Sequence, residues 1–195
     1  MKLLFVIFLA GTLCHNVFLQ NNNLSEITVF TWKEAKNANP DTIYAISFKK
    51  NKLKQVPKEL SNYTKLIYLN LEKNKLQELP ENLDTLINLK YLNISKNKFE
   101  IFPLVVTRLF ELKTLIANRN YFQRIPNNIK YCKALHKIDL WNNPIEFFSE
   151  GFFELENLKE LDLSSIRFSP KHHKKIVEKF GEIDLKIDAP CDCMD

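Results

Sequence analysis

Apolar residues recur along the chain with a fixed period of 23 residues, and an asparagine marks each copy. Apolar residues stand eight, five and three positions before that asparagine and two positions after it. The copies read IYAISFKKNKL, LIYLNLEKNKL, LKYLNISKNKF, LKTLIANRNYF and LHKIDLWNNPI. A constant period of about 20 to 50 residues indicates a stack of structural repeats. The marker residues are Asn51, Asn74, Asn97, Asn120 and Asn143.

Each copy predicts one short strand. Leu69 and Leu71 alternate with Tyr68, Asn70 and Glu72, which is the pattern of a strand with one face toward the core. Since all the copies share this spacing, the strands are expected to lie in register.

A proline follows at the same spacing in four copies and breaks the strand pattern. Because proline lacks a backbone donor, this half of the repeat cannot be an interior strand or the middle of a helix. It is expected to be an extended turn that leads into a helical or 3₁₀ turn. The prolines are Pro57, Pro80, Pro103 and Pro126, and Ser149 takes this place in the next copy.

Distinct segments flank the repeats and predict caps, because an open stack must cover its first and last hydrophobic layers. Residues 21–42 contain Thr31-Trp32-Lys33-Glu34, the pattern of a helix capping box. Residues 169–195 begin with Ser169-Pro170, a helix start, and Gly181 can end that helix. Alternating apolar residues in 183–187 then predict a last parallel strand.

The consensus LxxLxLxxNxLxxLPxxLxxLxx over about residues 43–168 resembles the 23-residue, proline-containing leucine-rich repeat. The segment TWKEAKNANPDTIYAISF also resembles the leading cap of secreted bacterial members. The resemblance implies an α/β solenoid: a leucine-rich-repeat horseshoe with a parallel concave sheet and short helical or 3₁₀ turns on the convex side. Members of the family are mostly protein-binding scaffolds.

The repeated asparagines are expected to be structural. A carboxamide carries donors and an acceptor, so one side chain can satisfy buried backbone groups of its own turn and of the next. Candidate function therefore moves to the side chains that point outward from the strands.

Those outward positions form columns that contain aromatic and amide residues. Tyrosine and tryptophan often anchor interfaces, so the columns predict a binding surface for a protein or peptide. The alternative is that cross-strand tyrosines only stabilise the sheet. The candidate binding residues are Tyr68, Asn70, Tyr91, Asn93, Ile116, Asn118, Lys137 and Trp141.

A basic residue precedes four of the asparagines and gives a runner-up hypothesis. Stacked repeats would align these residues in a stripe for a polyanion or glycan, although lysine is also common in solvated loops. The formal net charge of +5 is only mildly basic, so no nucleic-acid partner is expected. The stripe consists of Lys50, Lys73, Lys96 and Arg119.

The start of the chain predicts export. Residues 1–20 place Lys2 before an apolar run and then small residues, which is the layout of a signal peptide, with the cleavage site left open. The run is shorter than the roughly 20 apolar residues of a bilayer span. The expected location is secreted, cell-surface or periplasmic, without a membrane span after cleavage. Oligomeric state stays open.

Catalytic signatures are missing from the sequence. It contains no nucleophile elbow, phosphate loop or zinc helix motif, so the chain is not expected to be an enzyme or to carry a cofactor or metal. Cys132 falls in a core column, whereas Cys191 and Cys193 lie in a short acidic tail and can oxidise or pair.

Overall fold

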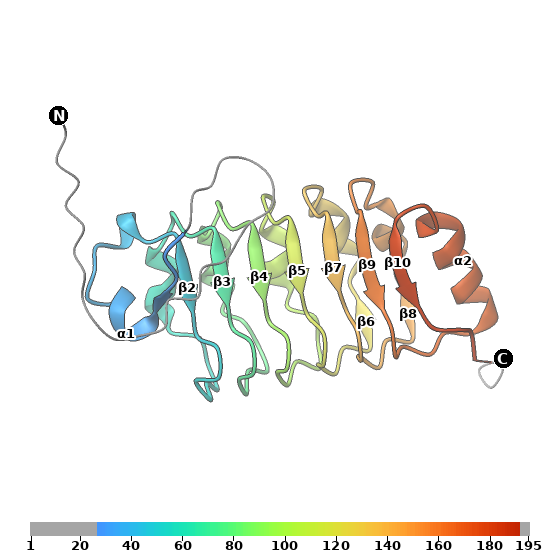
Figure 1. Ribbon diagram of the computed structural model, residues 1–195, viewed down its shortest axis with the longest axis horizontal. Coiled ribbons are helices and arrows are strands. Elements are labelled where there is room, and N and C mark those ends of the chain that lie inside the picture. Colours follow the sequence, from blue (N-terminus) through green and yellow to red (C-terminus); the bar gives the residue numbers. More distant parts are fainter. Residues whose placement is uncertain (1–26, 192–195) are drawn as a thin grey trace.

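The computed structural model describes residues 27–191. Strands stand side by side in one row, with the N-terminal cap at one end and a helix at the other (Figure 1). The signal peptide predicted at residues 1–20, the first part of the predicted cap and Cys193 lie outside the described residues.

One parallel sheet of eight strands forms the concave face, in the order β1-β2-β3-β4-β5-β7-β9-β10. Each strand is short because only the Leu-x-Leu segment of a repeat has both neighbours in register. The strands are β1 (Phe30–Thr31), β2 (Ala45–Ser47), β3 (Tyr68–Asn70), β4 (Tyr91–Asn93), β5 (Thr114–Ile116), β7 (Lys137–Asp139), β9 (Glu160–Leu163) and β10 (Asp184–Ile187). The predicted sheet, including its last strand, is confirmed.

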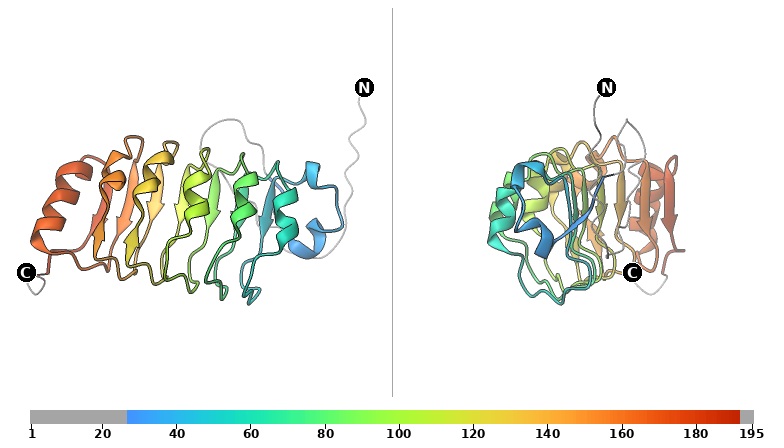
Figure 2. Two further views of the ribbon diagram at one scale, coloured as in Figure 1. Left: turned by 180° about the vertical axis from the view of Figure 1, so that it is seen from behind. Right: turned by 60° about the vertical axis from the view of Figure 1, so that its left-hand side comes forward.

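The proline half of each repeat forms a 3₁₀ helix on the opposite side of the solenoid (Figure 2). In the four copies that carry the proline, it is the residue immediately before the helix, as expected from its missing N–H. The helices are η2 (Lys58–Asn62), η3 (Glu81–Thr85), η4 (Leu104–Arg108), η5 (Asn127–Tyr131) and η6 (Glu150–Glu154).

A second, two-stranded parallel sheet was not predicted. It pairs β6 (Arg124–Ile125) with β8 (Phe147–Phe148), just before η5 and η6. The guanidinium of Arg124 lies 5.3 Å from the ring centroid of Phe147, so the exposed ends of the two strands also contact each other.

The inward-facing residues of all repeats form one continuous buried core. Cys132 belongs to it, as predicted, and its Sγ donates to the Val106 carbonyl at 3.4 Å. Burial raises the pKa of the Cys132 thiol to about 12.

A helix lies at each end of the described stack. Helix α1 (Trp32–Ala35) begins with the capping box, in which Thr31 accepts from the Glu34 N–H and Glu34 accepts from the Thr31 N–H. A short 3₁₀ helix, η1 (Pro40–Thr42), follows it. The Trp32 ring lies 5.3 Å from Phe48 and covers the first hydrophobic layer.

Helix α2 (Pro170–Phe180) starts after Ser169, whose hydroxyl accepts from the His172 N–H, and it ends at Gly181. Gly181 keeps a right-handed φ of −65° rather than the left-handed conformation common at such ends. Its N–H donates to the Val177 carbonyl, so the helical bonding continues to that residue.

The asparagine ladder is structural, with two corrections. Each buried asparagine links its own turn to the preceding repeat rather than to the next. Asn74, for example, accepts from the Leu53 N–H and donates to the Phe48 and Leu71 carbonyls. Asn51 is exposed, because the N-terminal cap precedes it in place of another repeat.

Candidate binding surface on the concave sheet

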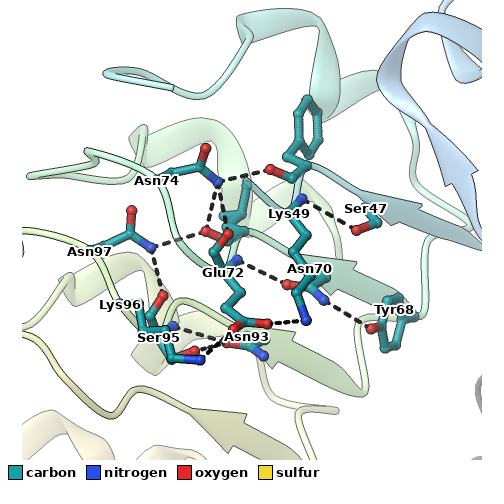
Figure 3. A network of polar contacts seen from close by, with 12 residues as sticks. Ser47, Lys49, Tyr68, Asn70, Glu72, Asn74, Asn93, Ser95, Lys96 and Asn97 are labelled. Carbon is teal, nitrogen blue, oxygen red and sulfur yellow. Dashed lines mark hydrogen bonds and ion pairs between the residues drawn. The ribbon is translucent and has the colours of Figure 1, made fainter. Parts of the chain in front are cut away.

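The strand register brings the predicted binding residues onto one face. Tyr68 is paired with Tyr91, Asn70 with Asn93, and Asn93 with Ile116 in the adjacent strands. Figure 3 shows the first part of this surface, where side chains of β3 and β4 meet those of the turns that follow them. Residues that the sequence places in one column are therefore neighbours on adjacent strands.

Tyr68 and Tyr91 form the aromatic centre of this face, with Tyr68 buried beside its neighbours and Tyr91 half-buried. Their ring centroids are 4.5 Å apart and the rings are nearly parallel, at 12°. The Asn70 amide donates to the Tyr68 hydroxyl at 3.3 Å. Burial, together with the neighbouring Tyr68, raises the pKa of Tyr91 to about 12, so both phenols stay neutral and can donate a hydrogen bond.

Two of the predicted binding residues also form hydrogen bonds with backbone N–H groups of the turns that follow their strands. Asn70 accepts from the Glu72 N–H at 2.9 Å, and Asn93 accepts from the Ser95 N–H at 2.9 Å. Asp139 accepts the Trp141 N–H at 3.1 Å in the same way. Asn and Asp side chains commonly accept from the backbone N–H two residues further along the chain. The recurrence of these residue types in one column of the sequence could therefore have indicated these bonds.

A charged cluster lies beside the tyrosines, and of its members only Lys96 was among the predicted site residues, as part of the basic stripe. Glu72 lies between Lys49 and Lys96, with N–O distances of 2.7 Å to both. Burial alone raises the pKa of Glu72, but the hydrogen bonds and charges of the two lysines outweigh it and lower the pKa below 4.5. The spacing of 23 residues between Lys49 and Glu72 was the signal for this contact.

The second half of the surface carries an indole and a half-buried carboxylate. Asn118 donates to Asp139 at 2.6 Å, and the Trp141 indole donates to the Ser165 hydroxyl at 3.2 Å. Burial raises the pKa of Asp139 above its ordinary value, although the bonds from Asn118 and Trp141 oppose this. Lys137 forms an ion pair with Glu160 on the next strand.

The basic stripe lies beside the asparagine ladder. All four stripe residues have a left-handed φ between 54° and 62°, where the chain turns away from its strand. Lys73, Lys96 and Arg119 line one open groove, and Arg167 joins them there. Lys50 does not line it. Lys96 already pairs with Glu72, and Arg119 lies 5.4 Å from the Trp141 ring.

Side chains suited to metal binding do not gather in groups of three or more anywhere between residues 27 and 191. No helix in the same range has the length and hydropathy of a membrane-spanning segment. Cys191 takes part in a disulfide bond. The surface therefore offers stacked rings, amides and paired charges, which are groups for non-covalent recognition.

Comparison with known proteins agrees with this architecture. The structure resembles that of a plant peptide hormone receptor, RGFR1 in complex with RGF2, with a TM-score of 0.58 and 20% sequence identity. The likeness covers 75% of this chain and 25% of that chain, so this protein spans about a quarter of the receptor structure. No curated protein sequence matches the chain.

The family model described as "Leucine-rich repeat region" matches residues 46–188. This range runs from the first repeat strand to the last strand of the sheet and includes all five residues of the asparagine ladder. By its repeat sequence and its fold, the chain belongs to the leucine-rich repeat family.

Proposed function

We propose that the protein is a recognition module that binds a protein or peptide on its concave sheet, with Tyr68, Tyr91, Ile116 and Trp141 as the anchoring side chains. The stacked tyrosines carry this proposal. Folding alone would accept small or polar residues at the outward positions of the tyrosine column, since Ala45, Thr114, Lys137 and Glu160 occupy it in other strands.

The polar groups around the anchors suit a peptide. The Asn118 carboxamide and the ion cluster of Lys49, Glu72 and Lys96 stand at the edge of the anchoring residues. Aromatic side chains supply apolar contact area at low conformational cost, while polar groups at the rim supply orientation. The solved receptor of similar fold is named as a complex with a peptide hormone partner, which agrees with this class of ligand.

The test is a quantitative pull-down from the extracellular fraction of the native source. Bait proteins are the wild type, the Tyr91→Ala/Trp141→Ala double variant, and Tyr131→Ala as a control. Tyr131 is 52% exposed and lies on η5, away from the concave sheet. A partner captured by the wild type and the control should be lost with the double variant. Unchanged affinity of the purified partner for the double variant would contradict the proposal.

A second candidate rests on the groove that three stripe residues and Arg167 share. Four basic residues along one groove favour a polyanion or an acidic glycan, although Lys96 is paired with Glu72 and Glu146 also lines the groove. Salt separates the two functions, because binding through exposed charges weakens as salt screens them, whereas an aromatic anchor tolerates salt. Retention on heparin that falls steeply between 50 and 200 mM salt, as about four neutralised charges would require, supports the groove. No retention at low salt excludes it.

The proposed partner is extracytoplasmic, because residues 1–20 have the layout of a signal peptide. Intact-mass measurement of the protein from the native source should show a chain shortened near residue 20. A full-length cytoplasmic protein would contradict export without affecting the concave-face proposal.

A further inference from the structure

The repeat that contains η4 departs from the others on the side of the 3₁₀ helices. Ile101 and Leu104 are large apolar residues, yet they are 81% and 50% exposed. The other repeats carry mostly polar residues at these positions. The residues equivalent to Ile101 are Gln55, Glu78, Arg124 and Phe147, and those equivalent to Leu104 are Lys58, Glu81, Asn127 and Glu150.

The fold does not require apolar side chains there. Pro80 and Pro126 precede 3₁₀ helices of the same length as η4, with polar residues at both positions. Phe147, the one other apolar residue in these columns, packs against Arg124 through the β6–β8 pair. Ile101 and Leu104 therefore expose apolar surface to water, and the fold gains no stability from this exposure.

These two residues belong to a groove rather than to a flat surface. Leu79 and Phe102, both buried, form its floor, and Ile101 and Leu104 stand along it. Contiguous exposed apolar surface of this kind marks interaction sites more often than single exposed residues do.

The polar part of the groove is acidic. Glu78, Glu81 and Glu100 line it, together with Lys98. Glu81 is paired with Arg108, whereas Glu78 and Glu100 are exposed and form no ion pair within the described residues. This local excess of carboxylates stands on a chain whose formal net charge is +5. A cation near this groove is attracted there, although the rest of the protein repels it.

We propose that this groove docks a cationic amphipathic segment of a partner protein. An apolar side chain of the segment lies between Ile101 and Leu104, and lysine or arginine residues on either side of it pair with Glu78 and Glu100. Apolar burial supplies affinity, and the charges select the partner and its orientation. Because the groove lies on the side of η4, a ligand on the concave sheet leaves it accessible, so this site is a second interaction surface.

Two labelled peptides of 12 residues test the proposal by fluorescence anisotropy. Both have the same central Leu-Phe-Leu core, flanked by lysines in one and by glutamates in the other. The variants are Ile101→Gln/Leu104→Glu, which installs residue types that other repeats carry, and Glu78→Gln/Glu100→Gln. The lysine-flanked peptide should bind the wild type at least tenfold more tightly than either variant, and the glutamate-flanked peptide should not bind.

Two controls locate the effect. Thermal unfolding of Ile101→Gln/Leu104→Glu should match that of the wild type, because both side chains are exposed. Tyr91→Ala/Trp141→Ala should bind the lysine-flanked peptide as the wild type does, so failure of the concave-face proposal remains distinguishable. Equal binding of both peptides, no measurable binding of the lysine-flanked one, or equal binding by Ile101→Gln/Leu104→Glu overturns the proposal. A wild-type dimer that this variant abolishes in sedimentation also overturns it, in favour of a second copy as the occupant.

Discussion

The Asn97 side chain reaches into the preceding repeat and accepts the backbone N–H of Leu76 at 3.1 Å. Its amide group donates to the carbonyls of Leu71, Ile94 and Ser95. One carboxamide thus bonds to backbone groups of two repeats just after their strands end.

Asn97→Ala should therefore destabilise the protein far more than Asn51→Ala. The first change leaves the N–H of Leu76 without its partner, whereas the carbonyls of Leu71 and Ile94 keep the amide groups of Asn74 and Asn120 as donors. The expected cost is about 2 kcal/mol in the free energy of unfolding. The second removes an exposed side chain and should cost less than about 0.5 kcal/mol. Urea unfolding of the two variants measures the difference. Equal losses would refute the structural role assigned to the ladder.

The regular part of the fold could be predicted because a period of 23 residues fixes the strand register. The exposure of Asn51 could not, because its sequence frame is the same as that of Asn74 and only the missing repeat before it differs. The β6–β8 pair was also missed, since Pro126 and the lack of alternation conceal a two-residue strand.

Gly151 lies on η6 in close contact with Asn127 of η5 in the preceding repeat. Its N–H donates to the Asn127 side chain at 2.8 Å, and a Cβ at this position would lie 2.0 Å from the Asn127 carbonyl oxygen. Gly151→Ala should cost about 1 to 3 kcal/mol, because backbone has to shift. Asn128→Ala, at the same position of the preceding repeat and exposed, is the matched control. Thermal unfolding of both variants should show a loss for the glycine variant alone.

The ion cluster around Glu72 predicts a pH dependence. Because the pKa of Glu72 is lower in the folded protein than its ordinary value of 4.5, its ionised form stabilises the native state. This contribution is fully present above about pH 4.5 and is lost as the pH falls through the folded pKa. Lys49 and Lys96 are 46% and 40% exposed, so solvent screening limits the contribution to about 1 kcal/mol.

The wild type should therefore have a higher free energy of unfolding than Glu72→Gln at pH 7, and this difference should shrink toward zero in acid. Glu78→Gln is the control, since it makes the same substitution at an exposed glutamate that forms no ion pair within the described residues. Denaturant titrations from pH 3 to pH 7 provide the measurement. A difference that grows in acid would have the wrong sign.

The sequence predicted which residues of the candidate site lie on adjacent strands, but it did not predict the hydrogen bonds and ion pairs that their side chains form. Register alone places Tyr68 beside Tyr91, whereas the turn bonds of Asn70 and Asn93 depend on side-chain rotamers that no spacing reveals. Glu72 illustrates the same limit. Its second lysine, Lys96, lies 24 residues away, outside the column that pairs it with Lys49.

Trp32 closes the N-terminal end of the core, and its loss should act locally. Its ring lies 5.3 Å from Phe48 and 5.7 Å from Tyr63, so Trp32→Ala exposes the first layer at a cost of roughly 3 kcal/mol. Since each repeat contacts mainly its neighbours, the first repeats should open before the last. Hydrogen exchange should accelerate in residues 43–63 and remain slow in residues 135–163. Trp141→Ala, on the concave face, should leave both segments protected, and a uniform loss of protection in Trp32→Ala would show that the stack unfolds as one unit.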